Sequence, residues 1–554
     1  MNKNFLFVVP RFAKKNEYYI FPYGLGYVIS NLKKNGFNVF ILNLCHYEES
    51  IEELLSAKIK NHDIDVVCTG GISHHWAEID DVINTVKKIN PRIITVVGGA
   101  IITSDIQLAL ENMQIDFGVV GEGEETLVEL ADALCNNKDF KQIKGIGFQD
   151  ADKKFILNDP RPPIKDLDSF PFPDYEGLEF DKWLEIDWVE QPSFQGLLFD
   201  LNNKQRLVEI NTSRSCPYNC TFCFHPLGNK YRQRSLDNVF KEIDFLKEKY
   251  DVTLINILDE LFSANEERIS EFANRIKKYN VKWMAQWRVD NINEGIIKKV
   301  KDSNIINVGL GVESFSDIVL TSMKKRITKA EIEQAYKVCD KVGVRVGSNI
   351  IFGDIAETEE TIKESMDWWK SHPQYNITLQ FIKAVPDSEI WQYAIKSGLI
   401  NDKKKFVLNK FPIINLTKIE DKKFHKFKRE IYEINFLNKY LMEGNVLSSE
   451  RTGNLYKNRS IYSFTVKCPV CSMESVYTYT KYSQLPFSII YCKHCYKRLK
   501  ISTRNAFKDS FFTHTRAVLY SNLVVIGCIK LWDYDFFKSF IKTVRRIMGT
   551  LPKN

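Results

Sequence analysis

Two blocks of short apolar runs constrain the fold of this 554-residue chain more than any other feature. In the first block, residues 1–150, five runs (FLFVVP, NVFILNL, IDVVCTG, RIITVVGG and IDFGVVG) are separated by helical patterns such as HWAEIDDVINTVKKIN. Runs of this length without polar alternation are typical of strands buried on both faces. We therefore expect an α/β protein with a Rossmann-like, doubly wound parallel sheet over residues 1–150.

The second block, residues 201–400, repeats this rhythm. Strand-like runs (VTLINILDE, KWMAQWRVD, IINVGLGVES, VRVGSNIIFG and NITLQFIKA) alternate with helical patterns such as NEERISEFANRIKKYN. The alternation predicts a partial (β/α) barrel of the TIM type, whose active site lies at the carboxyl ends of the strands. Between the blocks, residues 151–200 hold a segment rich in proline and acidic residues, which predicts an extended linker.

Composition narrows the setting of these domains. With 44% hydrophobic and 27% charged residues the chain is ordinary globular material, and a formal charge of +7 is too small to argue for a nucleic-acid partner. No run reaches the roughly 18 apolar residues of a membrane span, and the N-terminus MNKNFLFVVPRF shows no signal-peptide cleavage site. We expect a cytoplasmic location, where clustered cysteines bind metal more often than they form disulfides.

One such cluster, SRSCPYNCTFCF, follows the first strand-like run of the second block. It places Cys216, Cys220 and Cys223 at C-x3-C-x2-C spacing. Three thiolates can hold three corners of a four-iron cluster and leave the fourth iron open to a substrate or cofactor. The alternative is a zinc site with His225 as the fourth ligand, since structural zinc requires four.

Glycine-rich turns follow three strands of the first block. Gly70 and Gly71, Gly98 and Gly99, and the sequence GEGEE at 121–125 stand at strand ends. Ligands of doubly wound sheets bind at these ends, where glycine lets the backbone approach a flat or phosphorylated group. The alternative is that the glycines only make tight turns. No G-x-G-x-x-G follows the first strand, which argues against a nicotinamide site.

The segments PYGLGYVISNLKKNGFNVFILNL, VVGGAIITSD and DFGVVGEGEETLVELAD resemble the cobalamin (B12)-binding domain of a large bacterial superfamily of radical S-adenosylmethionine (SAM) proteins. The D-x-H-x-x-G element that supplies a cobalt ligand in some cobalamin proteins is absent, because His46, His74 and His75 do not fit it. The sequence therefore leaves open the possibility that this domain is vestigial. By this resemblance, the residues that would line the corrin and its tail are Gly70, Gly71, Ile72, Ser73, Gly98, Gly99, Ala100, Gly121, Glu122, Gly123 and Glu124.

The cysteine spacing, with Phe222 before the third cysteine, resembles that of the radical SAM superfamily. In that family the amino and carboxylate groups of SAM chelate the open iron of a [4Fe-4S] cluster. One electron from a donor such as flavodoxin or ferredoxin then cleaves SAM to methionine and a 5′-deoxyadenosyl radical. The segments VGLGVES and IIFGDIAETEETI match family segments that contact SAM. By this resemblance, the SAM contacts would be Phe222, Asp259, Glu260, Arg288, Glu313, Ser314 and Gly353.

The resemblance also implies roles for some of these side chains. Glu313 would bind the ribose hydroxyls, Asp259 or Glu260 the methionine amino group, and Arg288 the methionine carboxylate. The alternative is that each is a helix cap or part of a surface salt bridge. Beyond the cluster ligands, the sequence identifies no catalytic residue.

The last third of the chain begins with a helical connector, residues 401–460. Residues 461–505 then contain CPVC and CKHC, two knuckles that are 20 residues apart and enclose β-prone segments. The pattern predicts a zinc-ribbon-like site with four ligands, and a second iron-sulfur cluster is the alternative. The predicted ligands are Cys468, Cys471, Cys492 and Cys495.

The tail, residues 506–554, ends in a basic amphipathic pattern, FFKSFIKTVRRIMG. We expect this helix to pack on its own protein rather than on an anionic membrane. Single cysteines in apolar settings are expected to be small core residues. These are Cys45, Cys68, Cys135, Cys339 and Cys528.

The order of the two resemblances, cobalamin domain and then cysteine triad, predicts a cobalamin-dependent radical SAM enzyme. In relatives the cobalt carries a methyl group to a substrate radical, so we expect methylation of an unactivated carbon in a small-molecule, lipid or peptide substrate. Two alternatives stay open. One is a radical SAM enzyme with a vestigial first domain that catalyses cyclisation, rearrangement or methylthiolation, and the other is a non-catalytic iron-sulfur and zinc module that binds nucleic acid.

Overall fold

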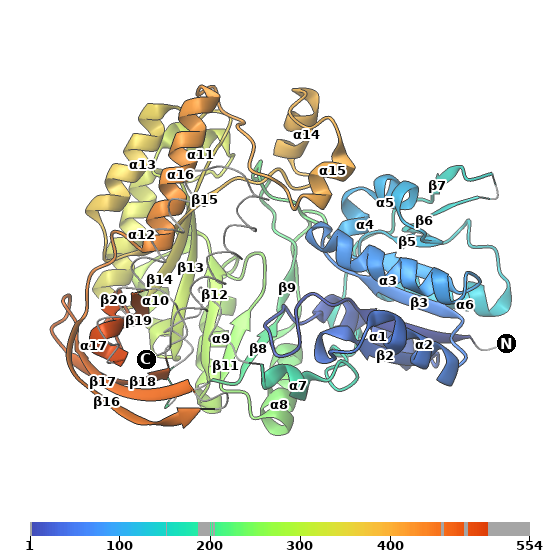
Figure 1. The fold of residues 1–554 in the computed structure, drawn as a ribbon, viewed down its shortest axis with the longest axis horizontal. Helices are drawn as coiled ribbons and strands as arrows, with labels where there is room; N and C mark the ends of the chain where they lie inside the picture. The colour runs from blue at the N-terminus through green and yellow to red at the C-terminus, as the bar shows by residue number, and fades with distance from the viewer. Residues whose placement is uncertain are drawn as a thin grey trace, which may run out of the picture.

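The structure is a computed structural model that describes residues 3–150, 152–186, 200, 202, 205–455, 459–480 and 486–507. Two α/β domains lie side by side, and a β-rich C-terminal region packs against the second (Figure 1). The predicted amphipathic helix at 536–549 and Cys528 lie outside the described residues. Within the described part of the chain, no helix is both long and apolar enough to cross a membrane.

The first domain is built on a seven-stranded sheet of order β2-β1-β3-β4-β5-β6-β7. Its first five strands in chain order are parallel, which is the predicted doubly wound topology. These strands are β1 (Asn4–Val9), β2 (Asn38–Asn43), β3 (Val66–Gly70), β4 (Ile94–Gly98) and β5 (Phe117–Val119). The helices are α1 (Tyr23–Lys34), α2 (Ile51–Asn61), α3 (Trp76–Ile89), α4 (Ala100–Ser104), α5 (Ile106–Asn112) and α6 (Gly123–Asn136).

Strand β1 shows why its apolar run has no polar alternation. Phe5 and Phe7 pack into the cluster that contains residues of α1 and α6, whereas Leu6 and Val8 pack with residues of α2 and α3. Each of these four side chains is at most 1% exposed. Both faces of the strand are therefore covered by helices, as the sequence predicted.

The sheet extends further than the sequence predicted. Strands β6 (Ile146–Gln149) and β7 (Phe155–Leu157) add to β5 in antiparallel order, so the sheet passes residue 150. The segment expected to be an extended linker also includes a short helix, α7 (Phe180–Leu184). Its side chains Phe180 and Trp183 are fully buried, together with Tyr175. This part of the segment is thus core rather than a solvated crossover.

The second domain contains a six-stranded sheet of order β15-β14-β13-β12-β11-β8, parallel throughout. The sheet is open between β15 and β8, which makes it the predicted partial barrel. The strands are β8 (Leu207–Ile210), β11 (Leu254–Ile257), β12 (Lys282–Trp287), β13 (Ile305–Glu313), β14 (Val346–Phe352) and β15 (Asn376–Phe381). The helices are α8 (Leu236–Tyr250), α9 (Glu266–Ile276), α10 (Glu294–Lys301), α11 (Asp317–Ser322), α12 (Lys329–Val342) and α13 (Glu359–Ser371).

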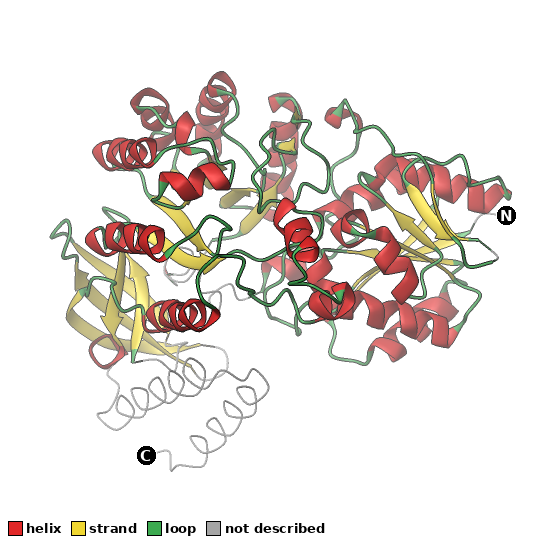
Figure 2. Ribbon diagram, turned by 90° about the horizontal axis from the view of Figure 1, so that it is seen from above, coloured by secondary structure: helices red, strands yellow, loops and turns green. Residues whose placement is uncertain are grey.

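Helices α14 (Glu389–Lys396) and α15 (Lys403–Leu408) join the two domains. Trp391 of α14 and Phe406 of α15 belong to the same apolar cluster as Trp76 of α3. Figure 2 shows the two domains from above. A shared core fixes their relative position more firmly than surface ion pairs would.

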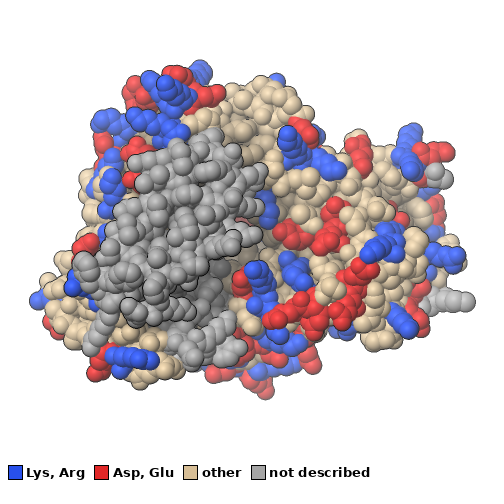
Figure 3. Space-filling model, viewed as in Figure 1, with Lys and Arg blue, Asp and Glu red and all other residues tan. Residues whose placement is uncertain are grey.

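The C-terminal region begins earlier than predicted. After α16 (Asp421–Leu437), an antiparallel sheet of β16 (Asn445–Leu455), β17 (Arg459–Lys467) and β18 (Glu474–Thr480) starts inside the segment expected to be helical. A hairpin of β19 (Phe487–Tyr491) and β20 (Arg498–Ser502) follows, and then α17 (Thr503–Phe507). Lysine and arginine side chains are interspersed with acidic ones over the face drawn in Figure 3, so the small excess of positive charge is not gathered there.

Candidate active site

The cysteine triad lies in the loop after β9 (Ser213–Arg214), which pairs with β10 (Arg232–Gln233). The chain enters the loop through Ser215, whose φ of 69° is left-handed. Thr221 fixes the middle of the loop, because its N–H donates to Met323 O (3.1 Å) and its carbonyl accepts from Ile390 N (3.0 Å). The triad is therefore held at the carboxyl ends of the barrel strands.

Positive side chains surround the triad. Lys325 is buried and donates to Glu313 Oε1 at 2.9 Å, and the guanidinium of Arg288 lies 3.6 Å over the ring of Tyr218. A hydrogen bond with Cys223, and then the charges of Lys325 and Arg288, lower the pKa of Cys220 to about 6, against the effect of burial. These contacts favour the thiolate of Cys220, which is the form that binds iron. Burial raises the pKa of Cys216, and the hydrogen bond with Cys220 raises that of Cys223.

The spacing of the sulfur atoms separates the two cysteine groups. Among the described residues, only Cys468, Cys471, Cys492 and Cys495 bring all of their sulfur atoms within 4.8 Å of one another. A tetrahedral zinc with bonds of about 2.3 Å holds neighbouring sulfurs about 3.8 Å apart. The triad is not among the groups that meet this limit. Its three thiolates can hold three corners of a four-iron cluster.

The C-terminal group has the spacing of a single tetrahedral ion. The sulfurs of Cys468 and Cys495 are 3.7 Å apart, and those of Cys471 and Cys492 are 3.6 Å apart. The first knuckle joins β17 to β18, and the second joins β19 to β20. The four thiols therefore link the two sheets of the C-terminal region.

The two predicted SAM contacts after β11 differ in their partners. Asp259 is buried, and its carboxylate accepts from Thr212 N (2.6 Å), Thr212 Oγ1 (2.5 Å) and Ser213 N (3.0 Å). It therefore orders the chain just before the triad. Glu260 accepts from His225 Nδ1 at 2.6 Å, while Nε2 of that imidazole is buried without a hydrogen-bond partner. The bond to Glu260 raises the pKa of His225.

The other predicted SAM contacts lie at the ends of β12, β13 and β14. Arg288 donates to Asp290 Oδ1 (3.0 Å) and to Lys325 O (2.9 Å). Ser314 is buried beside Ser365, at 3.3 Å between the hydroxyl oxygens, behind the strand end. Gly353, at φ +100°, donates its N–H to Glu357. Phe222 packs against the apolar cluster that joins the two domains.

Lys325 is the side chain near the triad that the sequence did not single out. It stands in MKKRITK, which resembles an ordinary solvated charge run, yet it is only 8% exposed. Its ion pair with Glu313 brings that carboxylate into the surroundings of Cys220. No pattern in the chain distinguishes it from its lysine and arginine neighbours.

A cavity of about 460 Å³ opens at the carboxyl ends of the first-domain strands. Its wall is mainly apolar and includes all the predicted cobalamin contacts except Ser73, which instead lies 3.1 Å from Ser104 Oγ. The wall needs glycine at Gly99, where a Cβ atom would lie 2.8 Å from Gly71 O. A large, flat and largely apolar group fits this wall.

The second domain closes the same cavity. Its contributions include Asn211, Arg214, Pro226, Leu227 and Leu258. Arg214 stands two residues before Cys216 and Pro226 stands three after Cys223, so the triad loop forms part of the wall. Of the histidines that fail the cobalt-ligand motif, His75 lines the cavity, stacks on Phe12 at 4.1 Å, and has an unpaired, buried Nδ1.

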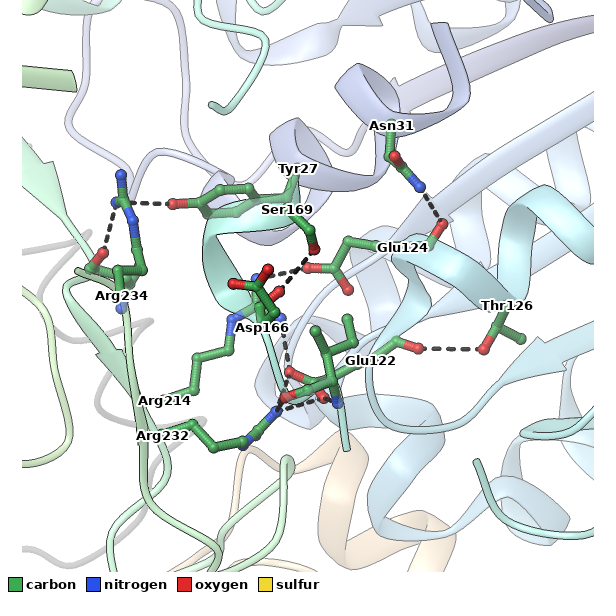
Figure 4. Close-up of polar contacts among 12 residues, drawn as sticks. Tyr27, Asn31, Glu122, Glu124, Thr126, Asp166, Ser169, Arg214, Arg232 and Arg234 are labelled. Carbon is green, nitrogen blue, oxygen red and sulfur yellow. Dashed lines mark hydrogen bonds and ion pairs between the residues drawn. The ribbon is translucent and has the colours of Figure 1, made fainter. Parts of the chain in front are cut away.

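A buried ion-pair network joins the GEGEE turn to the triad strand (Figure 4). Glu122 accepts from Arg214 Nη1 (2.7 Å), Arg232 Nη1 (2.7 Å) and Ile164 N (2.7 Å), and Glu124 accepts from Arg214 Nη2 (2.6 Å). Both carboxylates were predicted to line the corrin. They do line the cavity, but their oxygens bind arginines of the second domain.

Comparison with known proteins identifies both domains. The B12 binding domain model matches residues 13–131, and the radical SAM superfamily model matches residues 210–368. The chain is a B12-binding radical SAM protein. Its family implies a [4Fe-4S] cluster, SAM and cobalamin, and the triad and the inter-domain cavity fit these groups.

Relatives of this B12-binding radical SAM protein are distant. It is 28% identical over 424 residues to an uncharacterized methyltransferase of Pyrococcus horikoshii, covering 74% of this chain and 86% of that protein. It is 27% identical over 360 residues to the anaerobic magnesium-protoporphyrin IX monomethyl ester cyclase of Rubrivivax gelatinosus, covering 63% and 62%. The structure of the radical SAM methyltransferase TsrM from Kitasatospora setae matches with a TM-score of 0.59 at 17% identity, covering 72% and 77%.

The prediction that the single cysteines are buried core residues is confirmed for three of them and not for Cys135. Cys45, Cys68 and Cys339 are buried, as predicted. Cys135 is only half-buried, and its sulfur accepts from Lys3 N at 3.5 Å. Neither Cys45 nor Cys135 lies in a metal-binding group among the residues that the structure describes.

Proposed function

We propose that this chain is a cobalamin-dependent methyltransferase that methylates an unactivated carbon of a small organic molecule by radical chemistry. The observation that carries the proposal is the shared cavity, whose wall combines the glycine-rich turns of the B12 domain with residues on both sides of the cysteine triad. Two cofactors that must act on one substrate need such a common wall. Methyltransferases among the relatives support the methyl-transfer step.

When bound, the cluster and SAM supply a carbon radical and cobalamin supplies a methyl group. The chain supplies position and charge. The charges of Lys325 and Arg288 help to lower the pKa of Cys220, and they offset part of the negative charge that three thiolates would bring together. The mainly apolar wall keeps water from the space between the two domains.

The hydrogen bonds seen in the structure make some of the predicted SAM-binding residues better candidates than others. Glu313 stays the candidate for the ribose hydroxyls, because Lys325 holds its carboxylate near the triad. Glu260 is a better candidate than Asp259 for the methionine amino group, since the oxygens of Asp259 already accept three hydrogen bonds. Arg288, Phe222 and Gly353 complete the proposed set, and the buried Ser314 acts through packing.

For the first domain, we propose that the turns at 70–72, 98–100 and 121–124 contact cobalamin. Their backbones line the cavity, and Glu122 and Glu124 act by fixing the turn against the second domain. For the C-terminal region, we propose that the four cysteines bind one zinc ion. Sulfur separations of 3.6 and 3.7 Å match a tetrahedral ion better than a larger second cluster.

The proposed chemistry also sets the partners and the location. Reduction of the cluster requires a low-potential electron donor such as flavodoxin or ferredoxin. Free thiols and an oxygen-sensitive cluster suit the cytoplasm, where thiols stay reduced. We propose no nucleic-acid partner for this enzyme.

The test is anaerobic turnover of the reconstituted full-length protein with SAM and dithionite, with 5′-deoxyadenosine and S-adenosylhomocysteine measured as products. The proposal predicts both, because one SAM is cleaved to the radical and another donates its methyl group. The Cys220→Ala variant should not assemble a complete cluster and should form no 5′-deoxyadenosine. If the loaded protein forms 5′-deoxyadenosine but never S-adenosylhomocysteine, methyl transfer is refuted in favour of cyclisation or rearrangement.

A further inference from the structure

A second cavity, of about 770 Å³, lies inside the partial barrel. Barrels of this type are usually filled by bulky apolar side chains, and parallel sheets are usually apolar on both faces. Here the inner face of the sheet presents Gln286, Asn349 and Gln380, whose side chains are exposed to the cavity. The outer face keeps the normal core pattern, with Val308 and Val312 buried.

One row across the sheet shows how the space is kept open. Strand pairing places Gln286, Gly309, Gly347 and Asn376 side by side on four successive strands. A Cβ atom at Gly309 would lie 2.5 Å from Gln286 Oε1, so only glycine lets that amide lie across the sheet. The two glycines leave a shallow trough between two amides, and a polar molecule can approach the backbone there.

The charged side chains in the described wall of this cavity are all positive. Among the described residues its wall carries Lys383, Lys439 and Arg498 and no aspartate or glutamate. Seven side-chain amides accompany these cations. They are Gln286, Asn307, Asn349, Asn376, Gln380, Asn435 and Asn438.

The hairpin of the four-cysteine region supplies one end of the wall. Tyr491, the last residue of β19, and Arg498, the first of β20, both line the cavity. Cys492 directly follows Tyr491, and Cys495 stands three residues before Arg498. The cysteine knuckle therefore fixes the two ends of the hairpin that face the barrel.

A second arginine lies behind this wall. Arg345, just before β14, is 7% exposed, and its guanidinium lies 3.7 Å over the ring of Tyr491. Its Nε and Nη1, and Nε of Arg498, are buried without a hydrogen-bond partner. Burial, and then the charge of Arg498, lower the pKa of Arg345 despite the neighbouring Tyr491. Two guanidiniums that lack an acidic partner in the described structure leave strong donors unused, which is costly unless an anion binds.

We propose that this cavity binds a small anionic molecule through a carboxylate or a phosphate group, which Arg498 on the cysteine-bound hairpin recognises. The site goes beyond the proposed function, because Arg345 and Tyr491 place its arginine end at the amino ends of the strands, whereas the triad lies at their carboxyl ends. The C-terminal metal site would then position the arginine that binds the anion. The amide rows then bind the hydroxyl or carbonyl groups of the same molecule.

The test uses the full-length, anaerobically reconstituted protein and two probes, pyrophosphate and citrate, titrated by calorimetry. We expect saturable binding of at least one probe, and the tighter probe tells phosphate from carboxylate. Binding should weaken by roughly tenfold or more in Arg498→Ala, because a hydrogen bond to a charged group is lost. Lys500→Ala is the matched control, since it removes a cation from the same strand outside the cavity wall and should leave binding unchanged.

The Cys495→Ser variant tests the role of the metal site. It should lose anion binding as Arg498→Ala does, while its iron content stays that of the parent protein. Absence of saturable binding of both probes to the parent protein, or equal loss in Arg498→Ala and Lys500→Ala, would overturn the anion assignment. Unchanged binding in Cys495→Ser would overturn the positioning role. Formation of 5′-deoxyadenosine in all these proteins separates either failure from failure of the proposed function.

Discussion

Replacing Glu122 by glutamine should loosen the contact between the two α/β domains. Glu122 is buried and accepts from two guanidiniums, those of Arg214 and Arg232, and from one backbone N–H. The Glu122→Gln change keeps the side-chain volume and removes the charge. Arg214 keeps Glu124 as its partner, but Arg232 loses its carboxylate partner.

The expected cost follows from the burial of the pair. Removing one partner of a buried ion pair typically costs about 3–5 kcal/mol, because the other charge stays buried without compensation. Glutamine retains an acceptor oxygen, so we expect about 3 kcal/mol. Glu125→Gln, in the first turn of α6 just after Glu122, is the matched control. Its carboxylate is half exposed and meets Arg161 at 3.4 Å, so the control should cost less than about 1 kcal/mol.

Hydrogen–deuterium exchange read by mass spectrometry measures this effect locally, which a single unfolding transition of a multidomain chain does not. The opening free energy of peptides covering β5 and α6 should fall by about 3 kcal/mol in Glu122→Gln. Adding Arg232→Met to Glu122→Gln should restore part of the loss. Equal protection in Glu122→Gln and Glu125→Gln would refute the claim that this network holds the domains together.

Three further predictions concern the barrel. Burial raises the pKa of Glu357 to about 8 from 4.5, so its contribution to the free energy of unfolding is complete below pH 4.5 and is lost as pH rises toward 8. In urea unfolding between pH 5 and 9, Glu357→Gln should make the free energy of unfolding fall less steeply with pH, and an unchanged slope would contradict this account. Lys325→Met should raise the KM for SAM about tenfold by leaving Glu313 unpaired, with iron content unchanged, whereas Lys324→Met, on the exposed side, should not. Gly309→Ala should displace the Gln286 amide at little cost in melting temperature, because the clashing atoms end a flexible, exposed side chain; a large loss that Gln286→Ala does not rescue would argue against that clash.

The strands of both sheets could be predicted because burial on two faces leaves a strong mark in the sequence. A run such as FLFVVP, short and apolar at every position but its last, is too brief for a buried helix and too apolar for a solvated loop. Strands β6 and β7 were missed because they are only four and three residues long and add in antiparallel order. The buried aromatic side chains of the linker were missed because proline and acidic residues dominate its composition.

The grouping of the four C-terminal cysteines could be predicted from their spacing alone, and their sulfur atoms do come together in the structure. Contacts between distant segments could not be predicted. Asp259 stands at a strand end like a ligand residue, but its oxygens bind Thr212 and Ser213, which pairing of β8 with β11 brings beside it. Lys325 and Arg214 gain their roles only when the triad loop packs against the strand ends and the B12 domain.

The measurement that tests the account most directly is the iron, cobalt and zinc content per chain, by elemental mass spectrometry, of protein purified without oxygen from cobalamin-fed cells. The account predicts about four irons, one cobalt and one zinc. Iron and zinc without cobalt would contradict the central claim, because the cavity between the domains would then not bind cobalamin. About eight irons without zinc would instead place a second cluster at the C-terminal cysteines.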